Sequence, residues 1–226
     1  MLIAENLTKE FPRRGGDLDI LRGVSFQLAP GRSLAVMGPS GCGKSTLLNI
    51  LGTLEPPTSG RVTIDGEDPF RLAPQALARF RNRRIGFVFQ EHHLLPHLTA
   101  LENVLLPSLA RKDSGDMSGK AVELLGRVGL SDRRDHFPAE MSGGERQRAA
   151  IARALLLGPA IVLADEPTGN LDRRTAGEIA DLLSELPRAD QVALVVVTHS
   201  ETLAARFDRT CELIDGALVD KAAAQV

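Results

Sequence analysis

The sequence is poor in several residue types, and each shortage excludes a class of protein. It has no Trp, no Tyr and only two cysteines, Cys42 and Cys211. Two cysteines so far apart suit neither a disulfide framework nor a Cys-rich metal site, so a reducing cytoplasm is the expected compartment. Apolar runs such as Val192–Val197 are far too short to span a bilayer. The opening residues, Met1–Glu10, lack the regions of a signal peptide.

Basic residues are not in excess either. The formal net charge is −2, and only five of the 27 basic residues are Lys. This balance gives no reason to expect a nucleic-acid partner. What is present is an ordinary globular composition, 43% hydrophobic and 25% charged, in 226 residues. That length suits one large α/β domain or two small lobes.

Strand patterns occur in both halves of the chain. Leu2–Phe11 and Leu18–Leu28 alternate apolar and polar residues like antiparallel strands, with a turn at Pro12–Asp17 between them. Ser33–Met37 and Arg61–Ile64 are further short strands. Three more apolar runs are typical of buried parallel strands; they are Ile85–Gln90, Ile161–Asp165 and Ala193–Thr198.

Helical patterns dominate the middle of the chain. Lys44–Leu54 is expected to be a helix that ends before Pro56. Residues 91–158 contain no convincing buried strand, and we interpret them as a helical subdomain inserted into an α/β core of residues 1–90 and 159–226. Its expected helices are Ala100–Ala110, Met117–Val128 and Gly143–Leu157, with a polar loop at Lys112–Gly119. Ala222–Val226 is expected to be a loose tail.

A glycine-rich segment between a strand and a helix matches the phosphate loop pattern G-x-x-x-x-G-K-[ST]. Its backbone N–H groups would face the phosphates, Lys44 would reach the outer phosphates, and the Ser45 hydroxyl would bind Mg²⁺. A simple Gly-rich turn is the alternative. The segment, which predicts ATP and Mg²⁺ as cofactors, comprises Gly38, Pro39, Ser40, Gly41, Cys42, Gly43, Lys44, Ser45 and Thr46.

Polar side chains follow three of the predicted parallel strands, where α/β sheets gather their ligands. Asp165 at the end of its strand would hold Mg²⁺ through water, and Glu166 would orient or deprotonate an attacking water. His199 would contact the γ-phosphate. Gln90 offers an amide oxygen to the metal or to water. Each of these residues alone is weak evidence for a site, but their order after the phosphate loop favours one.

A second anion-binding helix start lies far along the chain. Ser142 is suited to cap a helix there, and Gly143 and Gly144 leave the amides uncovered at the positive end of the helix dipole. One nucleotide needs only one such surface. Two copies of the chain, head to tail, could close both surfaces around two nucleotides.

Phe11 and a cluster of histidines each have two possible interpretations. Phe11 could stack on a nucleotide base, or it could simply pack at the end of its strand. Three of the five histidines lie at residues 92–97. The spacing of His93 and His97 invites a metal site, but Pro96 breaks the helix that such a site would need. A loop that contacts a partner is the other interpretation.

Together these motifs resemble the nucleotide-binding subunits of ABC transporters, over essentially the whole chain. The resemblance implies a P-loop NTPase (RecA-like) α/β core with an N-terminal antiparallel β subdomain and an inserted α-helical subdomain. Met141 and Glu145 are mild departures from the family pattern. Phe11 falls where the family usually has its base-stacking aromatic. The motifs, in family order, are Walker A at 38–45, the Q-loop at Gln90, the signature at 141–145, Walker B at 161–166, the D-loop at 170–172 and the switch His199.

The resemblance also implies a mechanism. Two subunits would sandwich two ATP molecules, each between the phosphate loop of one subunit and Ser142–Gly144 of the other. Glu166 would polarise the water, His199 would steady the γ-phosphate, and Asp172 would link the two sites. ATP binding would favour the closed dimer, and hydrolysis would release it.

Two longer stretches narrow the resemblance. Asp165–Asp172 is similar to the lipoprotein-releasing (Lol-type), macrolide-exporter (MacB-type) and cell-division (FtsE-type) ATPases, and Phe89–Val104 favours the Lol type. We therefore expect a subunit on the cytoplasmic face of the inner membrane that drives lipoprotein release through a separate membrane subunit with an extracytoplasmic domain. Efflux or mechanotransmission through a related partner is the alternative. A soluble ABC protein acting on ribosomes or DNA would need tandem cassettes or a coiled coil, which 226 residues lack.

Overall fold

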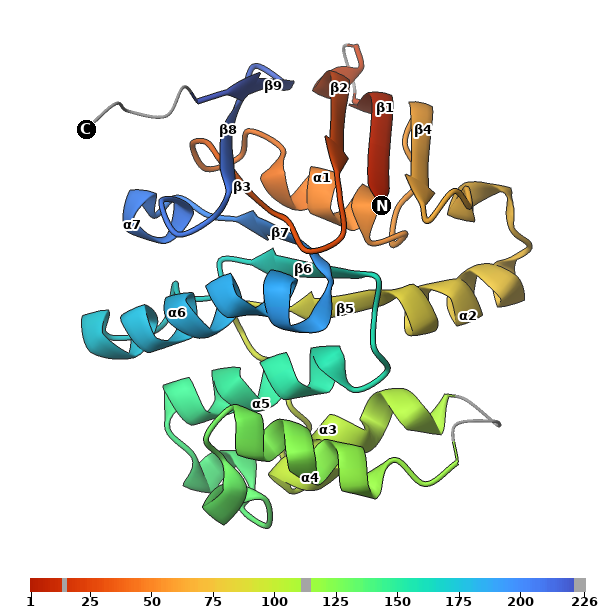
Figure 1. The fold of residues 1–226 in the computed structure, drawn as a ribbon. Helices are drawn as coiled ribbons and strands as arrows, with labels where there is room; N and C mark the ends of the chain where they lie inside the picture. Colours follow the sequence, from red (N-terminus) through yellow and green to blue (C-terminus); the bar gives the residue numbers. More distant parts are fainter. Residues whose placement is uncertain (14–15, 111–114, 222–226) are drawn as a thin grey trace.

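The computed structural model describes residues 1–13, 16–110 and 115–221. Within these ranges nine strands form two sheets, one of six strands in the order β5-β6-β7-β3-β8-β9 and one of three in the order β2-β1-β4 (Figure 1). The α/β fold expected from the sequence is confirmed. The predicted tail at Ala222–Val226, and parts of the predicted Pro12–Asp17 turn and Lys112–Gly119 loop, lie outside the described residues.

The six-stranded sheet sets the edge at which the predicted site residues meet. Its first five strands in sheet order pair in parallel, and only the last pairs antiparallel. Because parallel strands end at the same edge, the residues that follow Met37, Val88 and Asp165 are brought to one side of the sheet. The strands are β3 (Ser33–Met37), β5 (Ile85–Val88), β6 (Ile161–Asp165), β7 (Ala193–Val197), β8 (Arg209–Ile214) and β9 (Ala217–Asp220).

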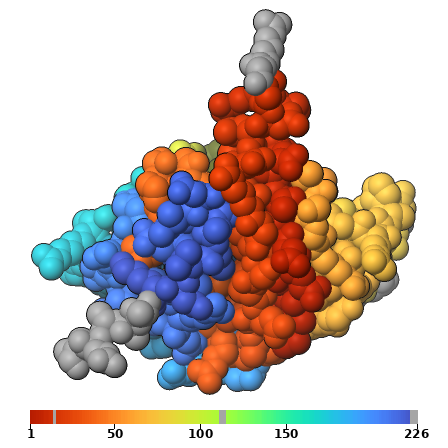
Figure 2. All heavy atoms as spheres, turned by 90° about the horizontal axis from the view of Figure 1, so that it is seen from above, coloured from red at the N-terminus to blue at the C-terminus, as the bar shows by residue number. Residues whose placement is uncertain are grey.

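The N-terminal strands form the antiparallel sheet that the sequence predicts. β1 (Leu2–Phe11) pairs with β2 (Leu18–Leu28) on one side and β4 (Ser59–Ile64) on the other. α1 (Lys44–Leu51) buries Leu and Ile side chains in the core shared by the two sheets. The sheets also meet at the surface, where β2 and β9 lie side by side (Figure 2) and the Arg22 N–H donates to the Gly216 carbonyl at 2.8 Å.

Helices cover the face of the six-stranded sheet that lies opposite α1 and the antiparallel sheet. Between β5 and β6 the described residues form helices and short 3₁₀ turns and no strand. α5 packs against both β5 and α3 in a second core (Figure 1). In the described ranges no helix is long and apolar enough to cross a membrane. The helices on this side are α3 (Ala100–Leu109), α4 (Ser118–Arg127), α5 (Gly143–Leu155), α6 (Arg173–Asp190) and α7 (Glu201–Ala204), whereas α2 (Pro74–Arg84) buries Phe80 in the core on the α1 side.

Several predicted boundaries were wrong. β5 ends at Val88 rather than Gln90, because its last partner on β6 is Ala164. α1 ends at Leu51 rather than Leu54, because Gly52 already caps it. The three helices predicted between residues 100 and 157 extended one or two residues beyond the ends of α3, α4 and α5. The helices α2, α6 and α7 and the strands β8 and β9 were not predicted.

The contact between α5 and β5 depends on a glycine. A Cβ atom at Gly86 would lie 2.5 Å from the carbonyl oxygen of Ala154 in α5, and that backbone cannot move aside cheaply. We therefore expect Gly86→Ala to lower the free energy of unfolding by about 1–3 kcal/mol, as overpacking does. Urea unfolding measures this change.

The matched control is Gly177→Ala in the middle of α6. No atom lies within 4 Å of a Cβ built there. Because Ala is the better helix former, we expect this variant to gain about 0.5–1 kcal/mol. If Gly86→Ala unfolded at the same urea concentration as the wild type, the close packing of α5 on β5 would not matter for stability.

Candidate functional site

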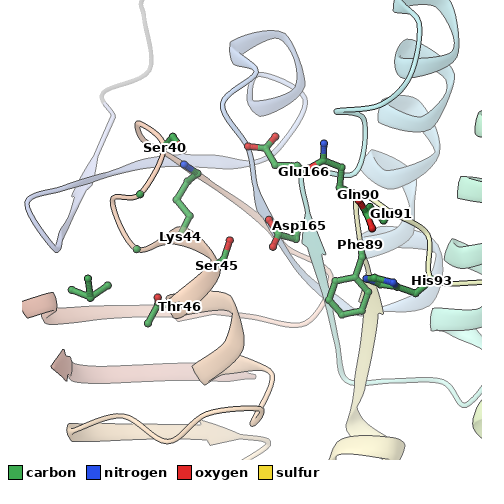
Figure 3. A pocket seen from close by; sticks show the side chains of 13 residues that line it. Ser40, Lys44, Ser45, Thr46, Phe89, Gln90, Glu91, His93, Asp165 and Glu166 are labelled. Atoms are coloured by element: carbon green, nitrogen blue, oxygen red, sulfur yellow. The ribbon is translucent and has the colours of Figure 1, made fainter. Parts of the chain in front are cut away.

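Most of the predicted phosphate-loop residues, together with Gln90, Asp165 and Glu166, meet around a cavity of about 440 Å³ at the carboxyl edge of the six-stranded sheet, whereas His199 is not among the lining residues. One wall is formed by residues 40, 41 and 43–46 of the phosphate loop (residues 38–46), and the opposite wall carries Gln90, Asp165 and Glu166 (Figure 3). In the figure, Lys44 and Ser45 face the two carboxylates across the cavity. Residues that were far apart in the sequence therefore share one polar pocket.

The phosphate loop owes its shape to glycine. Gly43 has a φ of 105°, and a Cβ there would lie only 2.8 Å from Cγ2 of Ile20. A side chain at this position is therefore excluded both by the left-handed backbone and by space. The Lys44 ammonium donates to the carbonyls of Gly38 and Pro39, each at 2.8 Å. The cation is thereby held among backbone groups that border the cavity.

Two acids at the end of β6 have different surroundings. Burial raises the pKa of Asp165, and the hydrogen bond with Ser45 and the charge of Lys44 only partly oppose this effect. Glu166 has a left-handed φ of 42°. Its Oε1 lies 2.8 Å from His199 Nδ1, and its Oε2 accepts from the Thr198 hydroxyl at 3.0 Å. Both oxygens of Glu166 are therefore oriented by the end of β7.

The raised pKa of Asp165 has a consequence for stability. The folded protein holds this proton more tightly than the unfolded chain, so stability falls as the pH rises from about 4 through the raised pKa. Asp165→Asn stays neutral at every pH. We expect it to raise the melting temperature of the nucleotide-free protein at neutral pH, but not well below pH about 4. Melting curves across pH measure this difference.

The same substitution should weaken the stabilisation by Mg-ATP, because it removes a charged oxygen from the wall opposite Ser45. Asp132→Asn, in an exposed turn, is the control and should change neither quantity. A fall in the melting temperature of nucleotide-free Asp165→Asn at neutral pH would contradict the assigned direction of the pKa shift.

Gln90 lies two residues beyond the end of β5. Its Nε2 donates to Asn170 Oδ1 at 3.0 Å, and Asn170 Nδ2 donates back to the Gln90 carbonyl at 3.5 Å. Asn170 belongs to the loop that follows Glu166. The two loops that border the cavity on this side are therefore joined directly.

The other predicted ATP-binding residues do not line this cavity. Ser142 caps α5 by accepting from the Glu145 N–H at 3.2 Å, while the Ser142 N–H donates to the Glu145 carboxylate at 2.7 Å. Chiefly this hydrogen bond, with the Arg133 guanidinium and the Ser142 hydroxyl, lowers the pKa of Glu145 to about 2. Asp172 caps α6 through the Thr175 N–H at 3.1 Å. Phe11 lies at the end of β1 with Lys9 Nζ 5.0 Å from its ring centre.

The neighbouring glycines, Gly143 and Gly144, begin α5. Neither they nor Ser142 lie among the residues that line the cavity of their own chain. The phosphate loop and the signature segment, residues 141–145, therefore remain separate surfaces in one copy of the chain.

Several residues around the site were missed by the sequence analysis. Ile20 follows no motif, and its position is set by the packing of β2 against the phosphate loop. Thr198 directly precedes the predicted His199, and that neighbourhood was the signal that could have found it. The cavity is also lined by Phe89, Glu91 and His93.

His92 and His93, two of the three histidines of residues 92–97, contact the chain itself. His92 Nδ1 lies 2.5 Å from Gln147 Oε1, and the His93 ring meets the edge of Phe89 with ring centres 5.0 Å apart. Among the residues with described positions, no group of three or more His, Cys, Asp or Glu side chains could hold a metal.

Comparison with known proteins places this geometry in a family. The family model described as ABC transporter matches residues 21–169. Two solved structures of the ATP-binding cassette MJ0796 share 40% of the sequence, with a TM-score of 0.86 and 96% of each chain covered. Both structures are dimeric, and one is a post-hydrolysis state bound to ADP and Pi.

Curated relatives match over nearly the full length. Lipoprotein-releasing system ATP-binding proteins LolD of Rhodopirellula baltica, Geobacter metallireducens and Syntrophus aciditrophicus are 54%, 53% and 49% identical to the chain. Each match covers 97% of this chain and at least 96% of the relative. With its fold, its phosphate loop and its paired acids, the chain belongs to the ATP-hydrolysing cassettes of the ABC transporter family.

Proposed function

We propose that the chain is the ATP-binding and ATP-hydrolysing subunit of an ABC transporter complex that drives lipoprotein release from the inner membrane. One observation carries this proposal: over nearly its full length, the chain is 49–54% identical to three lipoprotein-releasing subunits from different bacteria. The subunit would lie at the cytoplasmic face of the membrane and act through a separate membrane subunit with an extracytoplasmic domain.

The side chains around the cavity suit ATP hydrolysis. Lys44 and the N–H groups of the phosphate loop would bind the phosphates. Glu166, oriented by Thr198 and His199, would take a proton from the attacking water. His199 would then also contact the γ-phosphate.

A magnesium ion fits the same wall. The Ser45 hydroxyl, the Asp165 carboxylate and the Gln90 amide oxygen are hard oxygen donors, which Mg²⁺ prefers. Burial raises the pKa of Asp165, so a cation bound beside it would offset the cost of its charge there. Bound Mg²⁺ would neutralise charge on the phosphates.

The second half of each ATP site would come from a second copy of the chain. Ser142, Gly143 and Gly144 form a helix start outside the cavity of their own chain, and the solved MJ0796 relatives are dimeric. A head-to-tail homodimer would bring this helix start to the γ-phosphate of its partner. Asp172 would lie between the two sites, and Phe11 would stack on the base.

The membrane partner would dock beside the helical subdomain, for which we retain residues 91–158. A largely apolar groove of about 550 Å³ lies between α2, β5, α3 and α5. Phe87, Leu106 and Leu157 line it, and Phe89 and His93 line both this groove and the ATP cavity. A helix of the partner seated there would touch the loop that carries Gln90.

Capture of the membrane partner tests the proposal. Tagged Glu166→Gln protein would be recovered with Mg-ATP from detergent-solubilised membranes, with wild-type protein without nucleotide as the control. A membrane subunit whose extracytoplasmic domain binds lipoproteins supports lipoprotein release. A macrolide-exporter or cell-division type of partner would assign the chain to efflux or mechanotransmission instead. Recovery of ribosomes or DNA-binding proteins would overturn the membrane assignment.

A further inference from the structure

One buried side chain links the signature helix to the loop that carries Gln90. Gln147 lies on α5, three residues after Gly144, and is fully buried. Its Nε2 donates to the Phe89 carbonyl at 3.4 Å, and its Oε1 lies 2.5 Å from His92 Nδ1. The amide thus contacts the residues on both sides of Gln90 and Glu91.

The two contacts fix each other's direction. The Phe89 carbonyl only accepts hydrogen bonds, so the NH₂ group of Gln147 must face it and the oxygen must face His92. His92 must then carry a proton on Nδ1 and donate it. The Gln147 amide and His92 Nδ1 therefore fit together in one arrangement.

Arg153, two turns further along α5, holds the same loop by its backbone. Its guanidinium donates to the His92 and His93 carbonyls, each at 2.6 Å. Both histidines have left-handed backbones, with φ of 41° and 48°. Such conformations are strained in residues other than glycine and persist only where neighbouring structure holds them. Gln147 and Arg153 supply that support.

We infer that Gln147 and Arg153 are positioning residues, which fix residues 89–93 to α5 so that Gln90 and Ser142–Gly144 keep a set spacing. This inference rests on the proposed function, because it assigns Gln90 and the signature segment to ATP sites. α5 presents its N-terminal end to the nucleotide of the partner copy. The same helix sets where Gln90 stands in the cavity of its own chain.

The test is a double-substitution cycle on ATP turnover by the full-length purified protein. Gln147→Met keeps the shape of the side chain but leaves the Phe89 carbonyl and the His92 N–H without their partner. We expect kcat to fall about tenfold with KM for ATP within about twofold, because the phosphate loop is untouched. In a Gln90→Ala background, Gln147→Met should lower kcat no further, since it acts through Gln90.

Two further variants separate positioning from general stability. Arg153→Lys keeps the charge but loses the planar guanidinium that spans the two carbonyls. It should therefore lower kcat in the same way as Gln147→Met, without changing a side chain of the buried Gln147 contact. Ser33→Ala removes a buried hydroxyl that donates to Asp208 at 2.8 Å, at the far end of β3 from the phosphate loop. It should lower the melting temperature and leave kcat unchanged at temperatures where the protein is folded.

The outcomes are distinct. Wild-type turnover by Gln90→Ala would refute the proposed role of Gln90 and not the link to α5. If Gln90→Ala lowers kcat and adding Gln147→Met lowers it again by the same factor as in the wild-type background, the inference is overturned. An unchanged kcat in both Gln147→Met and Arg153→Lys would also overturn it. If Gln147→Met does not fold, Arg153→Lys in the two backgrounds decides the question.

Discussion

Glu166→Gln should lower the rate of ATP hydrolysis roughly 10²–10⁴-fold, the usual contribution of a positioned general base. The amide has the shape of the carboxylate and keeps an oxygen for the Thr198 hydroxyl or the His199 ring. It has no basic oxygen to take a proton from water. Turnover of Mg-ATP by purified protein, at a saturating nucleotide concentration, measures the loss.

The same variant should accumulate as an ATP-loaded dimer. If ATP binding closes two copies and hydrolysis opens them, then a block at hydrolysis shifts the population to the closed state. Size-exclusion chromatography with Mg-ATP should show a dimer for Glu166→Gln and mostly monomer for the wild type. Glu201→Gln, an exposed acid paired with Lys221, is the control and should behave as the wild type. Undiminished hydrolysis by Glu166→Gln would show that another group is the base.

The sequence predicts a strand well where an apolar run is bounded on both sides by turn residues. Ile161–Asp165 was predicted with the bounds that β6 has, because the apolar run lies between Pro159 and the Glu166-Pro167 turn. Ile85–Gln90 carries a similar run, yet β5 ends at Val88. The apolar side chain of Phe89 stacks on Phe87, with ring centres 5.5 Å apart. It extends the apolar run of the sequence beyond the strand, although Phe89 does not pair with a neighbouring strand.

The missed helices have weak signals of their own. α2 buries only Phe80 and carries a cluster of arginines, so it lacks the apolar stripe that marks a packed helix. α6 buries Ile179, Leu183 and Leu186 but contains Pro187 in its last turn, where a helix is expected to stop. In both cases contacts with the rest of the fold outweigh the local preference.

The site divides in the same way. Lys44, Asp165 and Glu166 could be placed from motifs because each follows a strand whose end is readable. The partner of Glu166 at Thr198 and the partner of His92 at Gln147 lie 32 and 55 residues away. Only the folded chain shows such pairs, since side-chain hydrogen bonds between distant segments leave no periodic pattern.

Lys44→Ala and Gly143→Asp should each abolish hydrolysis when every subunit carries the change, for different reasons. Lys44→Ala removes the ammonium, and hydrogen bonds from charged groups are worth about 1.5–3 kcal/mol each, so ATP affinity should fall about hundredfold or more. Gly143→Asp places a carboxylate where the partner's γ-phosphate is expected. Asp is favourable in the first turn of a helix, so α5 should stay folded.

The choice of Gly143 rather than Gly144 follows from space around the two residues. A Cβ at Gly143 would lie 3.3 Å from Leu171 Cδ2, the end of a flexible side chain, whereas a Cβ at Gly144 would lie 2.3 Å from Thr175 Cγ2. Substitution at Gly144 would therefore disturb the contact between α5 and α6. Circular dichroism should show that Gly143→Asp melts within a few degrees of the wild type.

Mixing the two inactive proteins then tests the head-to-tail dimer. In a mixed dimer, the intact phosphate loop of the Gly143→Asp subunit faces the intact signature segment of the Lys44→Ala subunit, so one of its two sites is complete. Random exchange at equal amounts makes half of the dimers mixed, so turnover should recover to about a quarter of the wild-type value if the sites act independently. A site built within one chain would give no recovery and no ATP-dependent dimer in the mixture. Recovery would place the signature segment of one copy on the nucleotide of the other, where the single chain leaves phosphate loop and signature apart.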